Sequence, residues 1–544
     1  MSEHLDEWDE NDDRVVPIER GRKRRELSAG SVVAVDDREE FWVSSSALSD
    51  AATRAMHVLA RLGTRVYRRG DTLSIVTQGD DPGVRDMTAQ RLDHELGALV
   101  IAKTRTPKGD EKSIALPPAM LAQMVSGTCR GIDALRRLDG IVSTPFLAPD
   151  GSVVEAVGYH AGSRHLMLDN SIAVDVKQCP TQAQAAEALA RLVDVFIDFP
   201  YPDAADRHVP IAALLTLLAS PAIEGNLPAF LFDATTAGSG KTLQQDVIGL
   251  LATGEICRKT SWIRDEDERR KSLMASALAG GNVLAFDNVS RDIAFGGADI
   301  DMLLTAGGRL QFRGLGAKDL LRVDWRPVIL ASGNNIGLTG DTHRRVLRAR
   351  LQTTEEDPEK RTEYVHPERA NRLIEWVRER RASLVADGLT ILRAFVVADR
   401  PNPLRMGSFA EWSALVPSAI VYAGGPNVLA CVPGSDDVSS ETDADLRLFL
   451  ETWPQIRMAM GPSWYAKDLV AHIWRTEGAN EELTELRDTL AESTRAKQGY
   501  DPSVKSVAKL LARWRGRVMG GRRVYCEKDT TTDTLKWCVE EVKK

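Results

Sequence analysis

The clearest candidate for chemistry is the glycine-rich segment Thr235-Thr-Ala-Gly-Ser-Gly-Lys241-Thr242. It follows the apolar run AFLFDA and precedes KTLQQDVIGLLATG, which reads as a helix. A tight turn between a strand and a helix points several backbone N–H groups into one concavity, and the positive end of the helix dipole adds to it, so phosphate oxygens bind there. We therefore expect Lys241 to reach the β- and γ-phosphates of ATP and the Thr242 hydroxyl to ligate Mg²⁺.

The full pattern of such a turn begins with glycine, where this chain has Thr235. The GSGKT end is intact, so we expect the phosphate cradle to survive this departure. The residues predicted to bind the nucleotide are Thr236, Ala237, Gly238, Ser239, Gly240, Lys241 and Thr242.

The second candidate is the run Val283-Leu-Ala-Phe-Asp287-Asn288. A buried strand that ends in a carboxylate can hold the Mg²⁺ shell, so Asp287 is predicted in that role, although it could instead cap a turn. Asn288 stands where many ring ATPases carry an acid that activates water, and an amide cannot take a proton. The water-activating group is therefore open. Either Asn288 only orients the water, or the base comes from elsewhere, where Glu266 and Glu268 are weak candidates because the run RDEDERRK is also typical of a solvated surface.

Two further segments complete the catalytic candidates. RPVILASGNN ends at Asn334-Asn335, where an amide could hydrogen-bond the attacking water or the γ-phosphate, unless the segment is a plain turn. Arg344 and Arg345 follow Asp341, and an arginine at a subunit edge can stabilise charge at a neighbour's γ-phosphate; the alternative is a solvated helix start. The catalytic candidates are Lys241, Asp287, Asn288, Asn334, Arg344 and Arg345.

The elements that position these residues alternate between strand and helix over residues 201–385. AFLFDAT, NVLAFDN and RPVILASGNN are short apolar runs that each end in polar residues or glycine, with helical stretches between them. This rhythm predicts a parallel sheet with helices on both faces. Ligands bind beyond the carboxyl ends of such strands, so we expect the polar residues to converge there.

Composition limits the remaining function classes. The chain has 544 residues, a net charge of −8 and a pI of about 5.8, so its net field does not steer it to nucleic acid. It shows no apolar run of the ~18 residues that a membrane helix needs and no signal-like apolar core, so we expect a cytoplasmic protein without a membrane partner. None of its six cysteines forms a CxxC pair, which argues against a zinc ribbon and a disulfide framework.

The rest of the chain is predicted to form flanking regions. Residues 1–45 are expected to be a disordered charged tail, whose basic cluster at 20–25 is either a nucleic-acid-binding arm or a solvated tail. Residues 46–200 should form an α+β region, with a helix in SDAATRAMHVLARLG, a hairpin around Gly70-Asp71 and a turn at Pro149–Gly151. Residues 386–445 read as a helical extension and linker.

The C-terminal region, 446–544, carries the concentrated positive charge. Helices are predicted near 446–460, 465–475, 480–492 and 503–515, followed by a turn-and-strand element in RGRVMGGRRVYCEK. Helices followed by a basic hairpin are typical of a winged helix, although a solvated basic face is the alternative. The predicted DNA-binding residues are Lys505, Lys509, Arg513, Arg515, Arg517, Arg522 and Arg523.

The order GSGKT, FDN, Leu310-Gln-Phe-Arg313-Gly-Leu-Gly316, SGNN and D-x-x-R-R resembles the ATPase of phage and plasmid primase-helicases, which is similar to superfamily 3 and AAA+ helicases. The resemblance covers roughly residues 60–530. It implies a P-loop NTPase core, nucleotide at Gly238, Gly240, Lys241 and Thr242, magnesium at Asp287, γ-phosphate sensing at Asn334 and a trans-acting arginine at Arg344 or Arg345. It also implies an oligomeric ring, expected to be a hexamer, that translocates on DNA. Priming chemistry does not carry over, because the sequence shows no zinc ribbon and no paired carboxylates in a strand context suited to nucleotide polymerisation; a primase, if needed, is expected to be a separate chain.

The sequence therefore predicts an ATP-dependent DNA helicase or translocase of a mobile element or prophage. Its DNA-contacting loops are expected between residues 288 and 322, with Arg309, Arg313, Lys318 and Arg322 as candidates. Two alternatives stay open. One is an ATP switch that does not unwind DNA, such as a replication initiator or helicase loader, and the other is an interaction protein with a decayed P-loop.

Overall fold

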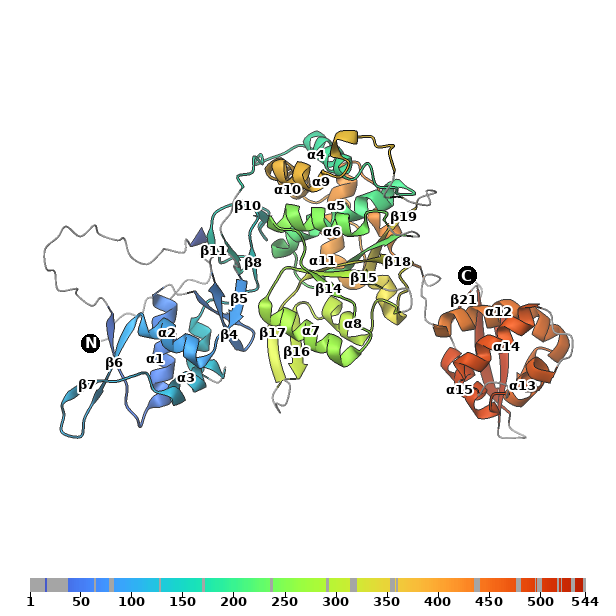
Figure 1. Cartoon of the computed structure of the whole chain (residues 1–544), viewed down its shortest axis with the longest axis horizontal. Coiled ribbons are helices and arrows are strands. Elements are labelled where there is room, and N and C mark those ends of the chain that lie inside the picture. Colours follow the sequence, from blue (N-terminus) through green and yellow to red (C-terminus); the bar gives the residue numbers. More distant parts are fainter. Residues whose placement is uncertain are drawn as a thin grey trace. The chain divides into compact units, whose positions relative to one another are not determined.

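The chain forms two compact units in a computed structural model. The first unit comprises Met1–Ser290, Ala298–Asn335 and Arg345–Val432, and the second comprises Arg291–Gly297, Ile336–Arg344 and Pro433–Lys544. Figure 1 colours both along the sequence. The structure describes residues 15–16, 38–62, 65–77, 83–126, 129–168, 172–234, 238–289, 293–313, 320–352, 358, 361–434, 441–475, 481–494, 496, 501–515, 518–519, 521–529 and 534–541.

The N-terminal part of the first unit is a mixed α+β body. Helix α1 buries Ala51, Ala55 and Leu59, which recur every four residues, against a three-stranded sheet of order β2-β6-β7. The predicted hairpin at Gly70-Asp71 is confirmed, because β3 and β4 pair across it. The elements are α1 (Leu48–Arg61), α2 (Ala89–Gly97), α3 (Pro118–Val125), β2 (Glu39–Trp42), β3 (Val66–Arg69), β4 (Thr72–Thr77), β5 (Gly83–Asp86), β6 (Val100–Arg105) and β7 (Glu111–Ser113).

A second group of short strands follows. The predicted turn at Pro149–Gly151 joins the antiparallel pair β9 and β10, with Ser152 N donating to the Asp150 carboxylate. A separate sheet has the order β1-β11-β12-β8; β8, β11 and β12 come from the same part of the sequence as β9 and β10, and β1 comes from residues 15–16. The elements are β1 (Val15–Val16), β8 (Gly140–Val142), β9 (Phe146–Leu147), β10 (Val153–Val154), β11 (Gly158–His160) and β12 (His165–Met167).

Part of the expected tail is ordered. Residues 39–42, which we placed in the disordered segment, form β2, because Phe41 and Val43 supply apolar side chains to the core around α1. β1 also falls within that segment, and the basic cluster at 20–25 lies outside the described residues.

The core of the first unit is a five-stranded parallel sheet of order β14-β15-β18-β13-β19, here called the central sheet. The three apolar runs predicted as strands are β13, β15 and β18, and they lie side by side. All six residues of β13 are buried, which explains its continuous apolar run, because a strand covered on both faces has no polar side. The strands are β13 (Ala229–Ala234), β14 (Lys259–Ser261), β15 (Val283–Val289), β18 (Val328–Asn334) and β19 (Val346–Leu351).

Helices cover both faces of the central sheet, with α5 and α6 above it and α7 and α8 below it in Figure 1. α4, which we assigned to the N-terminal region, packs against α10 instead, because its apolar face buries Leu189 and Leu192. An antiparallel hairpin, β16–β17, extends from the unit. The elements are α4 (Gln182–Val195), α5 (Ala204–Ala219), α6 (Lys241–Thr253), α7 (Glu266–Ala279), α8 (Ala298–Thr305), α9 (Leu373–Glu379), α10 (Arg381–Val397), α11 (Ala410–Tyr422), β16 (Arg309–Arg313) and β17 (Leu320–Asp324).

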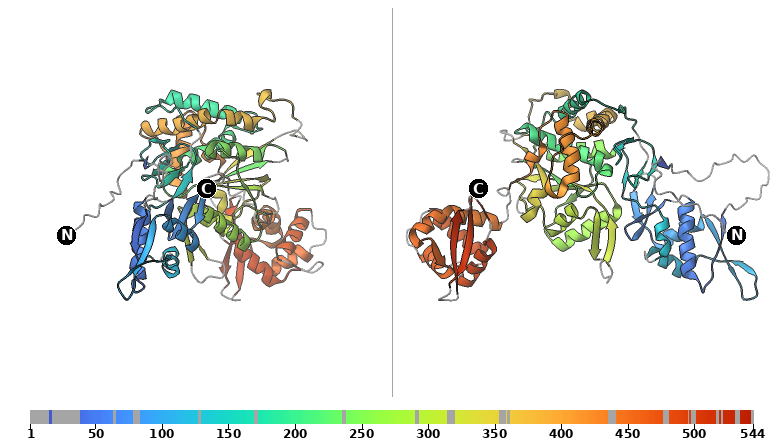
Figure 2. Two further views of the ribbon diagram at one scale, coloured as in Figure 1. Left: turned by 60° about the vertical axis from the view of Figure 1, so that its left-hand side comes forward. Right: turned by 180° about the vertical axis from the view of Figure 1, so that it is seen from behind.

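Over its described residues, the second unit carries four α-helices and a four-stranded antiparallel sheet of order β20-β23-β22-β21 (Figure 2). Phe449, Trp464 and Trp514 pack in its core, with ring centroids of Phe449 and Trp514 5.4 Å apart. All four predicted helices are present. The elements are α12 (Glu441–Met460), α13 (Ala466–Arg475), α14 (Glu481–Ser493), α15 (Val504–Trp514), β20 (Ser463–Tyr465), β21 (Val518–Met519), β22 (Arg522–Lys528) and β23 (Leu535–Glu541).

Short 3-10 turns connect several of these elements. They are η1 (Arg130–Ala134), η2 (Ser220–Ala222), η3 (Gly340–Arg345), η5 (Pro367–Arg369), η6 (Gly407–Phe409) and η7 (Val428–Cys431). Along the described part of the chain, no helix combines the length and apolarity that crossing a membrane would require.

Candidate nucleotide site

The glycine-rich turn lies between β13 and α6, as the sequence predicts. Thr235, Thr236 and Ala237 lie outside the described residues. Gly238 and Gly240 have φ values of 74° and 88°, a region that side chains with a Cβ rarely adopt. Gly240 also precedes the first residue of α6, so the turn delivers the chain directly to a helix N-terminus.

Gly240 has a second, steric reason to be glycine. A Cβ at this position would lie 2.7 Å from Cε1 of Phe199, well inside van der Waals contact. We expect Gly240→Ala to weaken nucleotide binding by at least tenfold, because the turn must shift to relieve both the clash and the backbone strain. The measurement is titration with a fluorescent ATP analogue. Gly225→Ala is the control: its φ is 82°, but nothing lies within 4 Å of the added Cβ, so its affinity should match that of the wild type.

Lys241 lies half-buried at the start of α6, near two carboxylates. Burial lowers the pKa of its ammonium, while the charges of Asp233 and Asp287 act in the opposite direction, and the net shift is downward. Asp233 is the penultimate residue of the neighbouring strand β13 and is buried. A phosphate near Lys241 would favour its charged form, so the site is electrostatically suited to an anion.

Asp287 joins three elements at the carboxyl edge of the central sheet. Its Oδ1 accepts hydrogen bonds from Thr242 Oγ1 of α6 at 2.9 Å, from Ser332 Oγ of β18 at 2.7 Å and from the N–H of Asn288 at 2.9 Å. Burial raises the pKa of this carboxyl, but the three hydrogen bonds outweigh it and hold the pKa below its usual range. Asp287 is therefore ionised at neutral pH.

The Thr242–Asp287 pair suits a magnesium ion. A hydroxyl and an ionised carboxylate, hydrogen-bonded to each other beside a phosphate-binding turn, are oxygen ligands of the kind Mg²⁺ takes. Ser332 was missed at the sequence level, although it lies in the SGNN segment two residues before Asn334. Its hydroxyl donates the shortest of the three hydrogen bonds to Asp287 and so helps to fix the orientation of that carboxylate.

The two asparagines lie at the same edge of the sheet. Asn334 is paired in register with Ala234, the last described residue before the glycine-rich turn. Its Oδ1 is buried without a hydrogen-bond partner among the described residues, as expected of an acceptor that a water or ligand would satisfy. Asn288 has a left-handed φ of 54° and lies where the β15–β18 register shifts between Phe286 and Val289, so the strand is irregular beside Asp287.

The other charged candidates differ in their surroundings. Glu266 and Glu268 lie in the exposed first turn of α7, and Glu268 pairs with Lys271, as expected for a solvated charge run. Arg345 is largely buried and forms an ion pair with Asp301 of α8 at 2.8 Å. Arg344 is exposed and pairs with Asp341 at 2.7 Å. Arg344 is therefore the more accessible of the two arginines.

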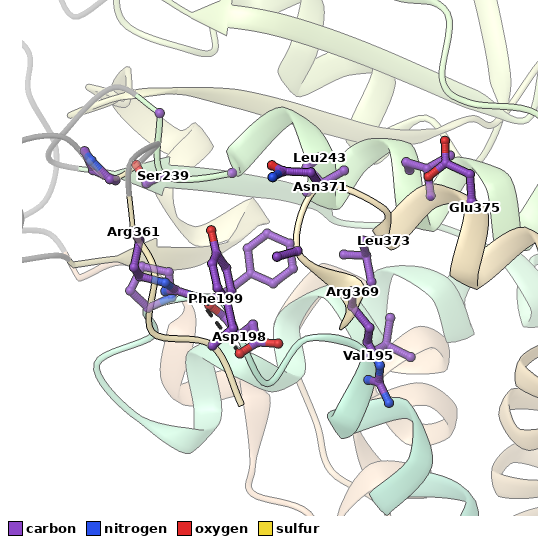
Figure 3. Close-up of a pocket in the computed structure, with 17 residues that line it drawn as sticks. Val195, Asp198, Phe199, Ser239, Leu243, Arg361, Arg369, Asn371, Leu373 and Glu375 are labelled. Carbon is purple, nitrogen blue, oxygen red and sulfur yellow. Dashed lines mark hydrogen bonds and ion pairs between the residues drawn. The ribbon is translucent and has the colours of Figure 1, made fainter. Parts of the chain in front are cut away.

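A cavity of about 560 Å³ opens beside Gly238–Gly240 (Figure 3). This volume lies within the ~300–1,000 Å³ typical of small-molecule pockets. Apolar side chains and a few polar groups line it, a mixture suited to a nucleoside. The lining side chains that could contact a base or ribose are Asp198, Phe199, Leu243, Arg361, Tyr364, Arg369, Asn371, Leu373, Ile374 and Glu375.

One wall of this cavity is the segment 361–372, here called the strap. The Asp198 carboxylate accepts a hydrogen bond from the Val365 N–H at 2.6 Å. Asp194 binds both His366 Nε2 and Arg369 at 2.7 Å, and although burial raises the pKa of Asp194, these two partners lower it below its usual range. The strap is therefore clamped to the end of α4. Sequence reasoning missed this site because its two walls lie about 165 residues apart, as the separation of Asp198 and Val365 shows.

No protein-family model and no curated protein matches this chain. Among solved structures, it is similar to the C-terminal region of NrS-1 in an A-form apo structure, at 12% identity and a TM-score of 0.35, covering 89% of this chain and 98% of that one. A second structure of that region matches at 11% identity and a TM-score of 0.35, covering 81% and 94%.

JCV helicase, solved with a bound inhibitor, matches at 14% identity and a TM-score of 0.22, covering 39% of this chain and 61% of that one. The functional assignment of this chain therefore depends on the geometry of its own site.

The residues predicted to contact DNA fall into two groups. In the region between 288 and 322 the structure has α8 and the β16–β17 hairpin; Arg309 is exposed, and Arg322 pairs with Asp71 at 2.9 Å. Lys318 and the side chain of Arg313 lie outside the described residues.

In the second unit, Lys505, Lys509 and Arg515 are exposed on or just after α15. Arg522 donates to the Leu450 carbonyl and Arg523 forms an ion pair with Glu540 at 2.8 Å, so both are engaged within the unit. Arg517 and the side chain of Arg513 lie outside the described residues.

Proposed function

We propose that this chain is an ATPase that uses hydrolysis to move or unwind DNA. The observation that carries the proposal is the cluster at the carboxyl edge of the central sheet. There the Thr242 hydroxyl, the ionised Asp287 and the ammonium of Lys241 lie beside a glycine-rich turn at a helix N-terminus. A cavity of nucleoside size adjoins the same turn.

Each residue of the cluster has a defined task in the proposed reaction. Gly238, Ser239 and Gly240 would bind phosphate oxygens through the backbone, and Lys241 would offset the charge of the β- and γ-phosphates. Thr242 and Asp287 would hold Mg²⁺, which when bound neutralises developing charge on the phosphates. The buried Oδ1 of Asn334 would accept a hydrogen bond from the attacking water and so orient it.

We further propose that the active enzyme is a ring in which Arg344 reaches the nucleotide of the neighbouring subunit. The exposure of Arg344 beside Asp341 supports this role, whereas Arg345 is engaged with Asp301 of its own chain. The test is native mass spectrometry with and without ATP, combined with ATPase assays in mixtures of Arg344→Ala and Lys241→Ala subunits. Restored turnover in the mixture supports a shared site, and purely additive losses contradict it.

A strand-displacement assay distinguishes the proposed motor from its closest alternative, a replication initiator or helicase loader. A forked duplex with a labelled strand should release that strand only with ATP and magnesium, and single-stranded DNA should stimulate ATP turnover. A replication initiator or loader would instead bind a specific duplex in the presence of ATP without releasing the strand. That outcome would replace the motor proposal with the switch.

We propose that the second unit binds duplex DNA as a winged helix. Support comes from the order of its elements, in which α13–α15 are followed by the β22–β23 hairpin and β20 pairs with β23. Val507, Leu510 and Trp514 of α15 are buried, while Lys505 and Lys509 lie on its exposed face.

We expect Lys505→Ala/Lys509→Ala to weaken duplex binding and to reduce the slope of log K against log salt by about 2, roughly one unit per lost phosphate contact. Fluorescence anisotropy over a salt series measures both quantities. Arg523→Ala should leave the slope unchanged, because the charge of Arg523 is already paired with Glu540. An equal effect of the two substitutions would exclude α15 as the binding face.

A further inference from the structure

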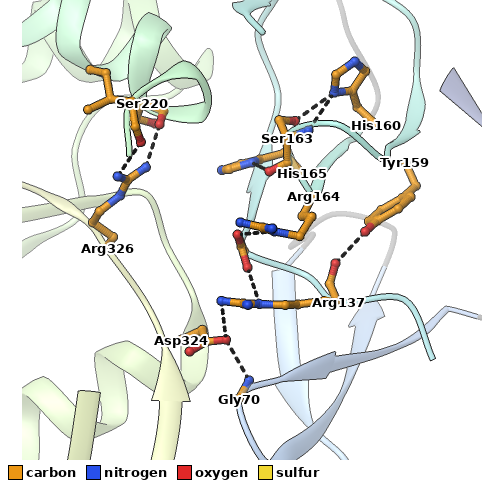
Figure 4. Close-up of polar contacts among 12 residues, drawn as sticks. Gly70, Arg137, Tyr159, His160, Ser163, Arg164, His165, Ser220, Asp324 and Arg326 are labelled. Carbon is orange, nitrogen blue, oxygen red and sulfur yellow. Dashed lines mark hydrogen bonds and ion pairs between the residues drawn. The ribbon is translucent and has the colours of Figure 1, made fainter. Parts of the chain in front are cut away.

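The turn between β3 and β4, formed by Arg69, Gly70 and Asp71, fits against two segments that lead into the central sheet. Both the turn and the central sheet belong to the first unit. Figure 4 shows Gly70 beside Asp324, the last residue of β17. The turn was predicted only as a hairpin, and nothing in the proposed nucleotide chemistry uses it.

Arg69 is the most deeply placed residue of this turn, with 2% of its surface exposed. Its guanidinium donates to the carbonyls of Ala277 at 2.9 Å and Leu278 at 3.1 Å, in the last turn of α7, and to the Asp324 carbonyl at 3.0 Å. Burial lowers the pKa of Arg69 to about 10, so it is still charged at neutral pH. A buried cation at a helix C-terminus interacts favourably with the helix dipole, and here it also bridges to β17.

Gly70 and its neighbours add contacts to the same strand. The Gly70 N–H donates to Asp324 Oδ2 at 3.1 Å, and Arg137 forms an ion pair with the same oxygen at 3.0 Å (Figure 4). Asp71 pairs with Arg322 at 2.9 Å. Gly70 has a φ of 60°, and a Cβ there would lie 2.7 Å from the Arg322 carbonyl oxygen. The turn therefore packs against β17 without room for a methyl group.

The two segments that Arg69 joins continue into the two strands that carry the nucleotide site. α7 is followed by Gly280–Asn282 and then β15, which carries Asp287 and Asn288 near its carboxyl end. β17 is followed by a short segment that includes Trp325 and then by β18, which carries Ser332 and Asn334. The starts of these strands are also bonded to each other. Trp325 Nε1 donates to the Gly281 carbonyl and the Val328 N–H to the Asn282 carbonyl, both at 2.8 Å.

We propose that the Arg69–Asp71 turn couples the β16–β17 hairpin to the nucleotide site. It holds the base of the hairpin, the end of α7 and the starts of β15 and β18 as one rigid group, so a force on the hairpin displaces the far ends of both strands. Packed elements of this kind transmit small shifts because they do not deform continuously. Arg69 and Gly70 are thus positioning residues, and the inference rests on the proposed DNA-dependent ATPase.

The closing experiment compares basal and DNA-stimulated ATP turnover in two glycine variants. Gly70→Ala inserts a methyl group between the turn and β17. Gly109→Ala is the matched control, since Gly109 has a φ of 91° in another hairpin of the same region but nothing lies within 4 Å of the added Cβ. We expect Gly70→Ala to keep the basal kcat within twofold and to lose at least fivefold of the DNA stimulation, whereas Gly109→Ala keeps both.

Arg69→Lys provides an independent variant. Lysine keeps the positive charge, but it lacks the planar guanidinium whose N–H groups reach three carbonyls at once. We expect the same selective loss of stimulation, with single-stranded DNA affinity unchanged. Wild-type stimulation in Gly70→Ala and Arg69→Lys overturns the inference, and so does a parallel fall of basal and stimulated turnover, which a purely structural role would produce. A wild-type protein without any ATP turnover would instead overturn the proposed function itself.

Discussion

Lys241→Ala is expected to reduce ATP turnover by roughly 100- to 1,000-fold, the loss seen when one preorganised donor is removed from a charged transition state. The reason is local charge. Asp233 and Asp287 are the carboxylates whose fields act on Lys241, and without the ammonium they would face the triphosphate with less positive charge to offset them. Steady-state release of phosphate measures the effect, and nucleotide titration shows whether binding is lost with it.

Lys271→Ala is the matched control for this substitution. Lys271 is exposed on α7 and pairs with Glu268, so its replacement makes the same change in net charge away from the cluster. Its turnover should equal that of the wild type. Turnover in Lys241→Ala within about threefold of the wild type would contradict the motor proposal and favour an interaction protein with a decayed P-loop.

Asp287→Asn should separate nucleotide binding from hydrolysis. The amide oxygen of asparagine can still accept hydrogen bonds from Thr242 and Ser332, so the local structure should persist, but the negative charge that would hold Mg²⁺ is gone. We expect magnesium-dependent turnover to fall roughly 100-fold, while magnesium-free nucleotide binding stays within a few-fold of the wild type. Turnover measured over a magnesium series tests this, and an unchanged magnesium dependence would remove Asp287 from the metal site.

Ser332→Ala should shift the acid limb of the pH–rate profile. The Ser332 hydroxyl is one of the donors that hold the pKa of Asp287 below its usual range, so its removal raises that pKa. Activity that requires ionised Asp287 is lost as the pH falls through this pKa, and the loss should therefore begin at a higher pH in the variant. An unmoved acid limb would mean that another group sets it.

The pairing of arginines changes the expected DNA-binding surface. From the sequence alone, Arg522 and Arg523 are predicted to bind DNA in the same way as Lys505 and Lys509, because all four are basic residues in one segment. In the folded chain, Arg523 faces Glu540 across the β22–β23 pair, whereas Lys505 and Lys509 are exposed on α15. Charge counts along a sequence cannot distinguish these cases, because the neutralising carboxylate lies on a different strand.

The sequence by itself determined the strands that form the centre of the first unit and the glycine-rich turn that follows one of them. Both signals are local: strands covered on both faces need continuous apolar runs, as in β13, and a left-handed turn before a helix needs glycine, as at Gly240. The hairpin at Gly70-Asp71 and the helices of the second unit were also predicted from local signals, because the pattern of apolar and polar residues that marks each element lies within that element.

Only the tertiary structure decided which side chains meet. Ser332 contacts Asp287 because β15 and β18 are neighbours in the sheet, although 45 residues separate them. The cavity wall at Val365 reaches Asp198 across 167 residues, and Arg69 reaches Asp324 across 255. Contacts of this kind leave no periodic trace in the sequence, because each depends on the packing of whole elements and not on the spacing of residues within one.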